Sequence, residues 1–476
     1  MSAPAVSFAR ADPRHQSDIL DSMPPHSNDL LGAQLPLVSL LPFAALLAGI
    51  AVIPLFAPRW WHSNRNKAIL ALLVSLPVLW HLGIHLGEPG RAVLADKLAD
   101  YLAFIVVIGA LFAITGGIHI QGSFSGTPLV NTGMLGIGAV LANLLGTTGA
   151  SVLLIRPLLR ANRPRRHTAH IVVFFIFVVA NCGGLLTPIG DPPLLLGFLR
   201  GVPFEWTLRL WPQWLAATLA LLLVFNVWDQ RALDREEQER PGSLLERVMQ
   251  HEPLRVRGTT SMAALVGVLV TIISAGRAAA AGHPWLPGAR EIVVAVLAGV
   301  AYLGSREHRQ RNQFGFAPMI EVAVLFAGIF ITMAPALELL NAWSQGARTV
   351  AGVGFGITHP WQFFWATGAL SSVLDNAPTY LVFVASAAGL QGIPAQGPFI
   401  GALAQDPALA RLLAAIATGA VFMGANTYIG NAPNFMVKAI AEENGIKMPS
   451  FFGYMAYSGG ILLPIFVALT FLFFRG

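Results

Sequence analysis

The sequence predicts an all-α polytopic membrane protein with ten transmembrane helices and two re-entrant hairpins. Of its 476 residues, 55% are hydrophobic and only 11% are charged, whereas soluble domains have about 25% charged residues. Apolar stretches of roughly the 20 residues that span a bilayer recur along the chain. Basic residues gather in the short segments between them. A soluble globular enzyme is therefore excluded.

The net charge of +6 does not indicate nucleic-acid binding, because the basic residues lie in short runs between apolar spans rather than on one patch. A single cysteine, Cys182, excludes an internal disulfide and every multi-cysteine metal or redox motif. Residues 1–34 form a polar segment without the apolar core of a signal peptide. We expect them to be a disordered tail, and we expect no resident cofactor or metal.

The ten predicted crossings begin at Pro36. They lie at 36–57, 68–87, 101–120, 171–199, 212–228, 259–276, 291–304, 318–341, 412–437 and 452–474. Two further apolar segments, 128–155 and 360–388, are interrupted by helix-breaking or polar runs at 146–151 and 375–379. Each is predicted to be a re-entrant hairpin, whose irregular backbone must be buried in protein or line a wet cavity.

The distribution of basic residues predicts the orientation. If both hairpins return to the side they left, 19 of the 30 Lys and Arg residues fall on one side of the membrane, as expected for a cytoplasmic face. The segment 229–258 is then a cytoplasmic linker. Both termini are predicted on the periplasmic side of a cell inner membrane.

Five crossings and one hairpin lie on each side of the linker, in segments 35–228 and 259–476. Because five is odd, the two segments would be inserted in opposite orientations, as in many secondary transporters. The heptads Thr187–Pro193 and Thr427–Pro433 support an inverted repeat, since they match at Thr, Ile, Gly and the last Pro. Asp191 of the first heptad aligns with Asn431 of the second.

Proline within these heptads prevents a continuous α-helix, so both crossings are predicted to unwind. Unwinding frees carbonyls that can coordinate a cation and exposes half-helix N-termini that favour an anion. Asp191 in the first break and Asp375 at the second hairpin tip are costly in a membrane, which makes each a functional candidate. A carboxylate that binds a proton or a cation in turn provides a basis for exchange, so both are predicted to couple protons.

The small polar residues near these acids would complete a site for a cation or substrate. Their hydroxyls, amides and carbonyls are hard oxygen donors, which favour alkali cations over soft metals. A transported sodium ion is thus the metal expected here. An anion would depend on helix N-termini and amides, or arrive with its own cation. The predicted set is Thr147, Thr148, Ser151, Thr187, Asp191, Asp375, Asn376, Thr379, Asn426, Thr427 and Asn431.

Several motifs resemble the ion transporter superfamily, which includes sodium/proton antiporters of the NhaD type, arsenite permeases and citrate transporters. The run Asn181–Asp191 is similar to the Asn-x-Gly-Gly...Pro-Ile-Gly-Asp motif of the antiporters, and Leu374–Thr379 to the Asp-Asn-x-x-Thr hairpin tip of antiporters and arsenite permeases. The resemblance implies a homodimer with elevator-like alternating access. Two departures are a first tip without the symporters' Asn and the unequal pair Asp191 and Asn431.

The sequence therefore predicts an ion-coupled secondary transporter, with sodium/proton antiport as the first hypothesis. A proton- or cation-coupled citrate or carboxylate transporter is the alternative, because the half-helix N-termini are rich in amides. An intramembrane aspartyl protease is a remote third, since Asp191 and Asp375 lack the flanking motifs of that class. The protein is accordingly expected to act on a small inorganic ion or small carboxylate rather than as an enzyme.

Overall fold

The computed structural model describes residues 31–122, 124–239, 248–249, 255–312, 314–347, 349–350 and 354–475. These residues form a helical bundle with one short β-ribbon, in which β1 (His119–Gln121) pairs with β2 (Arg255–Arg257). Within them, nine helices are long and apolar enough to cross a membrane. The predicted class, an all-α polytopic membrane protein, is confirmed.

Helices of the first half follow the predicted spans closely. The last of them continues past the expected linker start at residue 229, because Asp229, Leu233 and Glu236 are buried on one face of it. Their bounds are α2 (Leu31–Gln34), α3 (Leu41–Phe56), α4 (Pro58–Trp61), α5 (Asn64–Trp80), α6 (Gly87–Gly116), α7 (Pro128–Ala161), α8 (Ala169–Val178), α9 (Pro192–Leu199) and α10 (Trp211–Glu239).

Helices of the second half are arranged in the same order of long spans, hairpin and broken span. Their bounds are α12 (Thr259–Ala280), α13 (Ala289–Gly304), α14 (Arg306–Arg311), α15 (Ala317–Ser344), α16 (Pro360–Ser371), α17 (Asn376–Gly389), α18 (Phe399–Gln405), α19 (Pro407–Met423), α20 (Ala432–Glu443) and α21 (Phe451–Leu469). The spans expected at 171–199 and 291–304 are not among the nine long helices, since the first is broken and α13 has only 16 residues. The inverted repeat stays a prediction.

The long helix α7 reverses direction at Gly146. This residue has φ 75° and ψ 156°, a conformation open to glycine but strained for other residues. The two ends of α7 meet, because Asn131 Nδ2 donates to Asn162 Oδ1 at 3.0 Å and Asn162 Nδ2 donates to Asn131 Oδ1 at 2.8 Å. A straight 34-residue helix would separate its ends by about 50 Å, so this segment is a hairpin.

Helices α16 and α17 form a second hairpin. Helix α16 ends at Ser371 and α17 begins at Asn376, and the rings of Phe363 and Phe383 pack against each other with centroids 6.4 Å apart. The two crossings that follow the hairpins are both broken, between Val178 and Pro192 and between Met423 and Ala432. Helix α8 is buried throughout from His170 to Val178, which protects the interrupted backbone from lipid.

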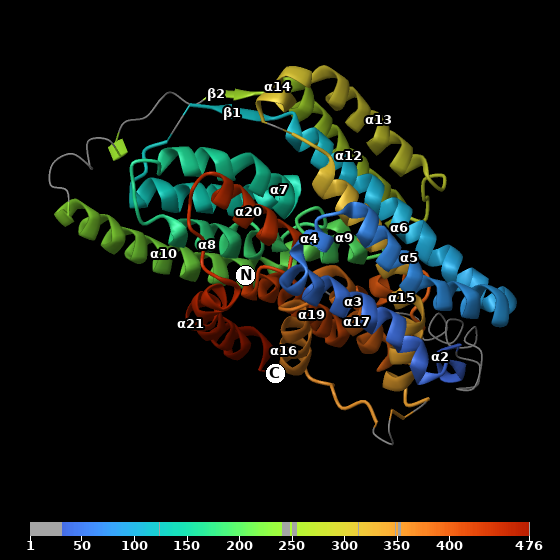
Figure 1. The fold of residues 1–476 in the computed structure, drawn as a ribbon. Helices are drawn as coiled ribbons and strands as arrows, with labels where there is room; N and C mark the ends of the chain where they lie inside the picture. Colours follow the sequence, from blue (N-terminus) through green and yellow to red (C-terminus); the bar gives the residue numbers. More distant parts are fainter. Residues whose placement is uncertain are drawn as a thin grey trace, which may run out of the picture.

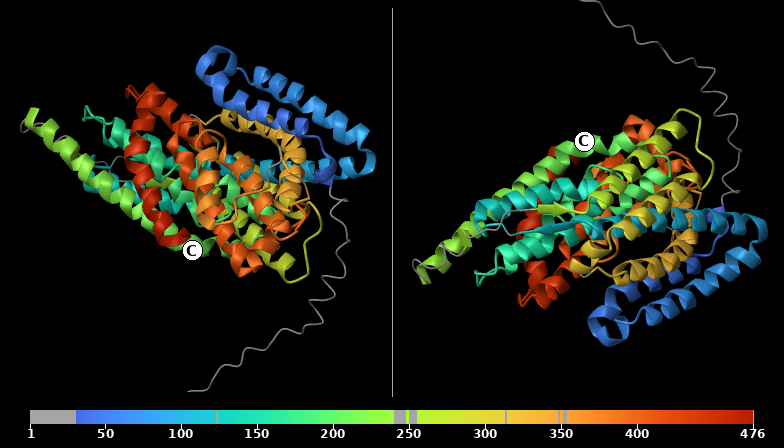
Figure 2. Two further views of the ribbon diagram at one scale, coloured as in Figure 1. Left: turned by 90° about the horizontal axis from the view of Figure 1, so that it is seen from below. Right: turned by 90° about the horizontal axis from the view of Figure 1, so that it is seen from above.

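A second group of helices flanks this interior. Figure 2 shows α3 and α5 on one side of the bundle, next to α15. Helix α6 joins this group to the interior, since it packs against both α15 and α7. Large apolar side chains on their outer faces are exposed, including Leu72, Leu76 and Trp80 of α5. Such a surface suits contact with hydrocarbon rather than water.

The end of the expected N-terminal tail is ordered. Residues 31–34, predicted as disordered, form α2, and the adjacent Leu35 is 2% exposed in a cluster with Val78 and Leu82. The apolar side chains of this segment explain the difference, because burying them stabilises the fold. The rest of the tail, 1–30, and most of 240–254 lie outside the described residues.

Candidate functional site

Asp191 receives hydrogen bonds from three other segments of the chain. Thr147 Oγ1 in the first hairpin donates to Asp191 Oδ1 at 2.7 Å. Asn376 Nδ2 in the second hairpin donates to Asp191 Oδ2, and Asn431 Nδ2 in the second break donates to Oδ1 at 3.3 Å. All four side chains are buried. One carboxylate therefore joins both hairpins to both broken crossings.

The local sequence positions this carboxylate. Asp191 has an extended backbone (φ −148°, ψ 148°) just before α9, whose first residues, Pro192 and Pro193, need no amide hydrogen there. Thr147 N donates to Gly190 O at 2.8 Å, which ties the break to the hairpin tip. A Cβ on Gly190 would lie 2.1 Å from Gly184 O, so only glycine fits.

Thr187 and Thr427 brace the two breaks in the same way. Thr187 Oγ1 donates to Asn143 O at 2.5 Å and accepts from Gly190 N at 3.1 Å. Thr427 Oγ1 donates to Ser372 O at 2.5 Å and accepts from Gly430 N at 3.1 Å. Each hydroxyl thus links its break to the preceding hairpin. Neither is hydrogen-bonded to Asp191.

Asn181 and Asn434 connect the two breaks to each other, and they were not among the predicted site residues. Asn181 Nδ2 donates to Asn434 Oδ1 at 2.7 Å, and Asn431 Nδ2 donates to Asn181 Oδ1 at 3.2 Å. Asn434 Nδ2 also donates to Thr427 O at 2.9 Å. The available sequence signal was the place of both amides beside helix breaks in apolar segments, since polar groups buried there need partners.

Asp375 lies at the start of α17, where it caps the helix. Its Oδ1 accepts from Ala377 N at 3.1 Å, and Thr379 Oγ1 donates to the Asp375 carbonyl at 2.9 Å. No Lys, Arg or His side chain in the described part of the chain bonds to Asp375 or Asp191. The carboxylate of Asp375 is half-buried and has no hydrogen bond to Asp191, so the structure brings Asn376 but not Asp375 into direct contact with the first break.

The other predicted residues lie around the hairpin tips. Asn426 Nδ2 donates to Ser372 Oγ at 2.8 Å in the second half. Thr148 is half-buried beside Thr147, and Ser151 is fully buried one turn further along α7. None of these three is hydrogen-bonded to Asp191.

Buried oxygen atoms without hydrogen-bond partners accompany this cluster. Within the described residues, they include Ser151 Oγ, Asn376 Oδ1 and Asn426 Oδ1. Such atoms are costly unless a ligand satisfies them. Hard oxygens beside the buried carboxylate of Asp191 are suitable donors for a sodium ion.

Four half-helices begin at this cluster. The second arm of α7 starts after Gly146, and α9, α17 and α20 start directly after Asp191, Asp375 and Asn431. Helix N-termini present free N–H groups and a partial positive charge, which together favour anions. The site therefore combines donors for an anion with oxygen ligands for a cation.

Comparison with known families gave one match across nearly the whole chain. A family model described as "putative citrate transport" matches residues 32–474. No curated protein matches the sequence. The match covers both hairpins, both breaks and all predicted site residues.

Proposed function

The chain belongs to this citrate transport family, and from that premise we propose that it is a secondary transporter of citrate or a similar carboxylate, moved together with a cation. Four half-helix N-termini that begin at one buried cluster are the observation that carries this proposal. They offer N–H donors to carboxylate groups without a basic side chain.

A coupled cation follows from the charges of the site. Asp191 and Asp375 would repel a multiply charged carboxylate unless each is protonated or shares a cation with it. The unpartnered oxygens of Asn376 and Asn426 can contribute to such a cation site. Sodium and protons are both suitable coupling ions.

Purified protein in proteoliposomes tests the proposal. Uptake of radiolabelled citrate should appear under an inward sodium or proton gradient and vanish when the gradient is collapsed by an ionophore. Asp191→Asn should reduce the uptake rate about 100-fold, while Asp234→Asn, a change at an exposed carboxylate, should not. Gradient-independent uptake by the wild type would contradict secondary transport.

Sodium/proton antiport is the second candidate, favoured by the carboxylate at the centre of an oxygen-rich cluster. If Asp191 binds sodium or one proton in turn, apparent sodium affinity should fall about tenfold per pH unit in the range where protons compete. A pH-sensitive dye inside the same liposomes distinguishes the candidates. Sodium-driven proton movement without citrate would favour antiport, and its absence would favour citrate transport.

We propose that the protein lies in a cell inner membrane. The segment 163–168 then faces the cytoplasm, and the segment 281–288 faces the periplasm. Arg163 and His283 are exposed in these segments, whereas the native Cys182 is fully buried. An impermeant thiol reagent on intact cells should therefore label His283→Cys but label Arg163→Cys only after lysis. The reverse pattern would invert the proposed orientation.

A further inference from the structure

A cavity of about 960 Å³ lies at the base of the first hairpin, where the two ends of α7 meet, and away from Asp191 near the hairpin tip. Its walls come from the end of α7, the segment 163–168, the end of α10 and the loop that follows α20. The volume is within the range of sites that bind small molecules, roughly 300–1,000 Å³. It shares no residue with the Asp191 cluster.

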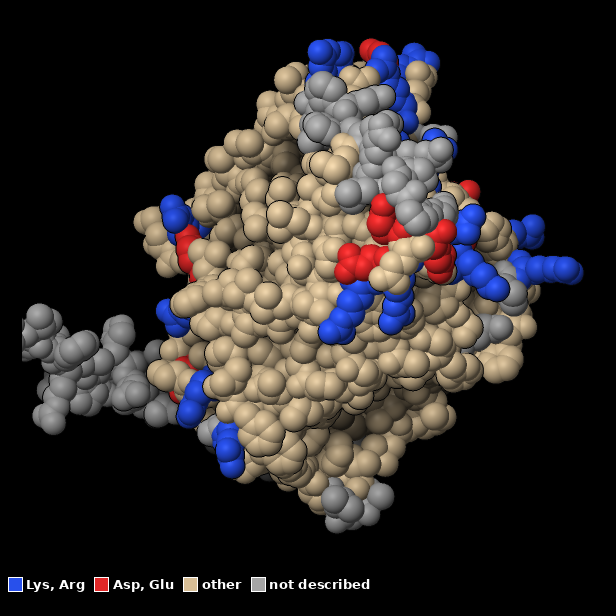
Figure 3. All heavy atoms as spheres, turned by 90° about the vertical axis from the view of Figure 1, so that its left-hand side faces the viewer, with Lys and Arg blue, Asp and Glu red and all other residues tan. Residues whose placement is uncertain are grey.

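The cavity is strongly basic. Arg163, Arg166, Arg235 and Lys447 line it with exposed side chains that form no ion pair among the described residues. Glu239 is the one acidic residue in its described lining. Figure 3 shows this end of the molecule, with Lys and Arg side chains at its upper, right and left edges, Asp and Glu among them, and a broad uncharged surface at its centre. The positive-inside rule explains basic residues at this end, but not their convergence on one hollow.

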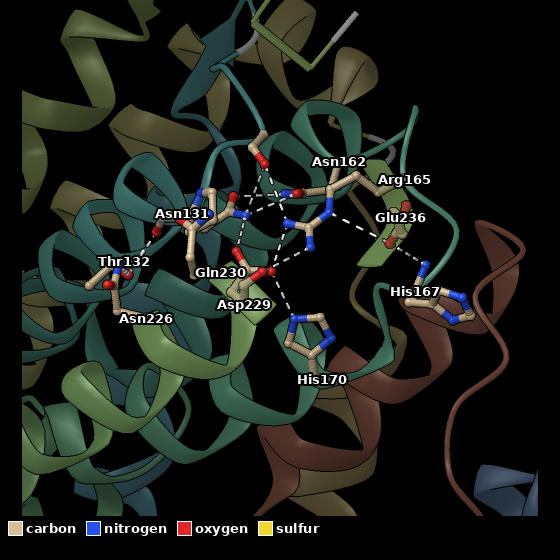
Figure 4. Close-up of polar contacts among 12 residues, drawn as sticks. Asn131, Thr132, Asn162, Arg165, His167, His170, Asn226, Asp229, Gln230 and Glu236 are labelled. Atoms are coloured by element: carbon tan, nitrogen blue, oxygen red, sulfur yellow. Dashed lines mark hydrogen bonds and ion pairs between the residues drawn. The ribbon is translucent and has the colours of Figure 1, made fainter. Parts of the chain in front are cut away.

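A buried ionic network fixes the floor of the cavity (Figure 4). Arg165 Nη1 contacts Asp229 Oδ1 at 2.6 Å, and the same oxygen lies 2.8 Å from His170 Nε2. Glu236 accepts from the backbone N–H groups of Arg166 and His167, both at 2.9 Å. The loop that carries Arg163 and Arg166 is thereby held in place before any ligand binds.

One buried donor in this network has no hydrogen-bond partner. The side chain of Arg165 is fully buried, and its Nε lies 3.9 Å from the nearest carboxylate oxygen, on Glu236. Arg165 also lines the cavity. An anion bound in the cavity would help to neutralise the positive charge of this guanidinium.

The cavity borders the lipid-facing surface. Trp228 of α10 and Tyr457 of α21 line it, and their rings stack with centroids 5.6 Å apart. Val224 and Val227 of α10 and Met455 of α21 are exposed on the neighbouring apolar surface. Trp and Tyr are enriched at the level of lipid headgroups, so this wall marks the membrane interface.

We propose that the cavity binds the phosphate headgroup of an anionic phospholipid, whose acyl chains lie along the exposed apolar faces of α10 and α21. Basic pockets between transmembrane helices bind such headgroups. A free cytoplasmic anion would not need the aromatic wall or the adjacent apolar surface. The lipid would tie the base of the first hairpin to α10 and α21.

Lipid binding to the purified full-length protein tests this proposal. The cavity variant Arg163→Gln/Arg166→Gln/Lys447→Gln removes three exposed charges. The control Arg59→Gln/Arg65→Gln/Arg306→Gln removes three exposed charges from the same predicted side but outside the cavity. Phosphatidylglycerol in mixed micelles should raise the thermal midpoint of the wild type through ligand linkage, and phosphatidylcholine should not. Native mass spectrometry should show the bound lipid.

The cavity variant should bind phosphatidylglycerol at least tenfold more weakly, while the control keeps wild-type affinity. All three proteins should unfold at the same temperature without added lipid, because the altered side chains are exposed. Equal affinities of the two variants would overturn the proposal. Full stabilisation of the wild type by inorganic phosphate alone would also overturn it, since a soluble anion would then be the ligand.

Discussion

The two broken crossings have nearly the same backbone but opposite chemical roles. Asp191 and Asn431 hold similar extended conformations before α9 and α20, with φ −148° and −153°. Thr187 and Thr427 make matching bonds to the preceding hairpins. Yet Asp191 accepts hydrogen bonds from both hairpins and from Asn431, whereas Asn431 donates.

This difference separates what the breaks share from what they do not. Matching threonines, glycines and prolines produce the same unwound geometry, which serves to expose half-helix N-termini in both halves. The charge is confined to one half, so the amide of Asn431 can stabilise the carboxylate instead of repelling it. A second carboxylate at that place would put two like charges within contact distance.

The largest effect is expected from Asp191→Asn. The substitution keeps the shape of the side chain but removes the charge. It also replaces one accepting oxygen with an NH2 donor, which would face either the donor Asn376 or the donors Thr147 and Asn431. Losing a charged hydrogen-bonding group costs about 1.5–3 kcal/mol, which predicts an initial transport rate reduced about 100-fold. Citrate uptake into proteoliposomes measures it.

Asp191→Asn should still insert and purify as the wild type does. The thermal midpoint in detergent is the control, because a folding defect would lower uptake for a trivial reason. A variant that folds normally and transports at the wild-type rate would show that the two breaks are equivalent and that the charge has no role.

The exchange Asp191→Asn/Asn431→Asp tests whether the position of the charge matters. Since the backbones match, the carboxylate moved to residue 431 should again accept from an amide, now at residue 191. Transport should recover to within about tenfold of the wild-type rate, a free-energy difference of about 1.4 kcal/mol. Uptake no better than that of Asp191→Asn would show that the hairpin donors Thr147 and Asn376 serve only a carboxylate that lies in the first break.

Much of the fold can be predicted from the sequence, because the signals for its spans and breaks are local. Apolar length predicts the spans, and proline with glycine predicts the breaks, which begin after Val178 and Met423. The family and the fold class are confirmed. The cluster around Asp191 was accessible for the same reason, since Thr147, Asn376 and Asn431 are polar residues inside apolar segments.

The misses depend on contacts between distant segments. The distribution of basic residues predicts only an orientation, and 229–258 is predicted to be a cytoplasmic linker. In the structure Arg165 and Asp229, 64 positions apart, form a fully buried ion pair. No local pattern distinguishes a buried arginine from its exposed neighbour Arg166, because the difference arises only when α10 packs against the first hairpin.

Asp375→Asn is expected to have a smaller effect than Asp191→Asn. Asn keeps an oxygen that can accept from Ala377 N, so the cap of α17 survives. If Asp375 binds the coupling proton, citrate transport should fall about tenfold, a free-energy difference of about 1.4 kcal/mol. Its dependence on external pH between 6 and 8 should also be lost. Uptake measured across this range is the readout. An unchanged rate and pH profile would leave capping as the only role of Asp375.

The smallest expected effect on transport comes from the matched pair Thr187→Val and Thr427→Val, which removes no charge. Valine keeps the β-branched shape but removes the hydroxyl. The first break then loses the bonds to Asn143 O and Gly190 N, and the second loses those to Ser372 O and Gly430 N. Gly190 N keeps a second partner in Thr187 O at 2.9 Å, whereas Thr427 Oγ1 also accepts from Ile429 N at 3.3 Å. Each variant should lose about 1–3 kcal/mol of stability, seen as a lower thermal midpoint in detergent. If the two breaks are structural equivalents, the two losses should agree within about 0.5 kcal/mol. A large loss at Thr187 with none at Thr427 would show that the resemblance of the two backbones does not extend to their energetics, and that the charged break alone depends on its brace.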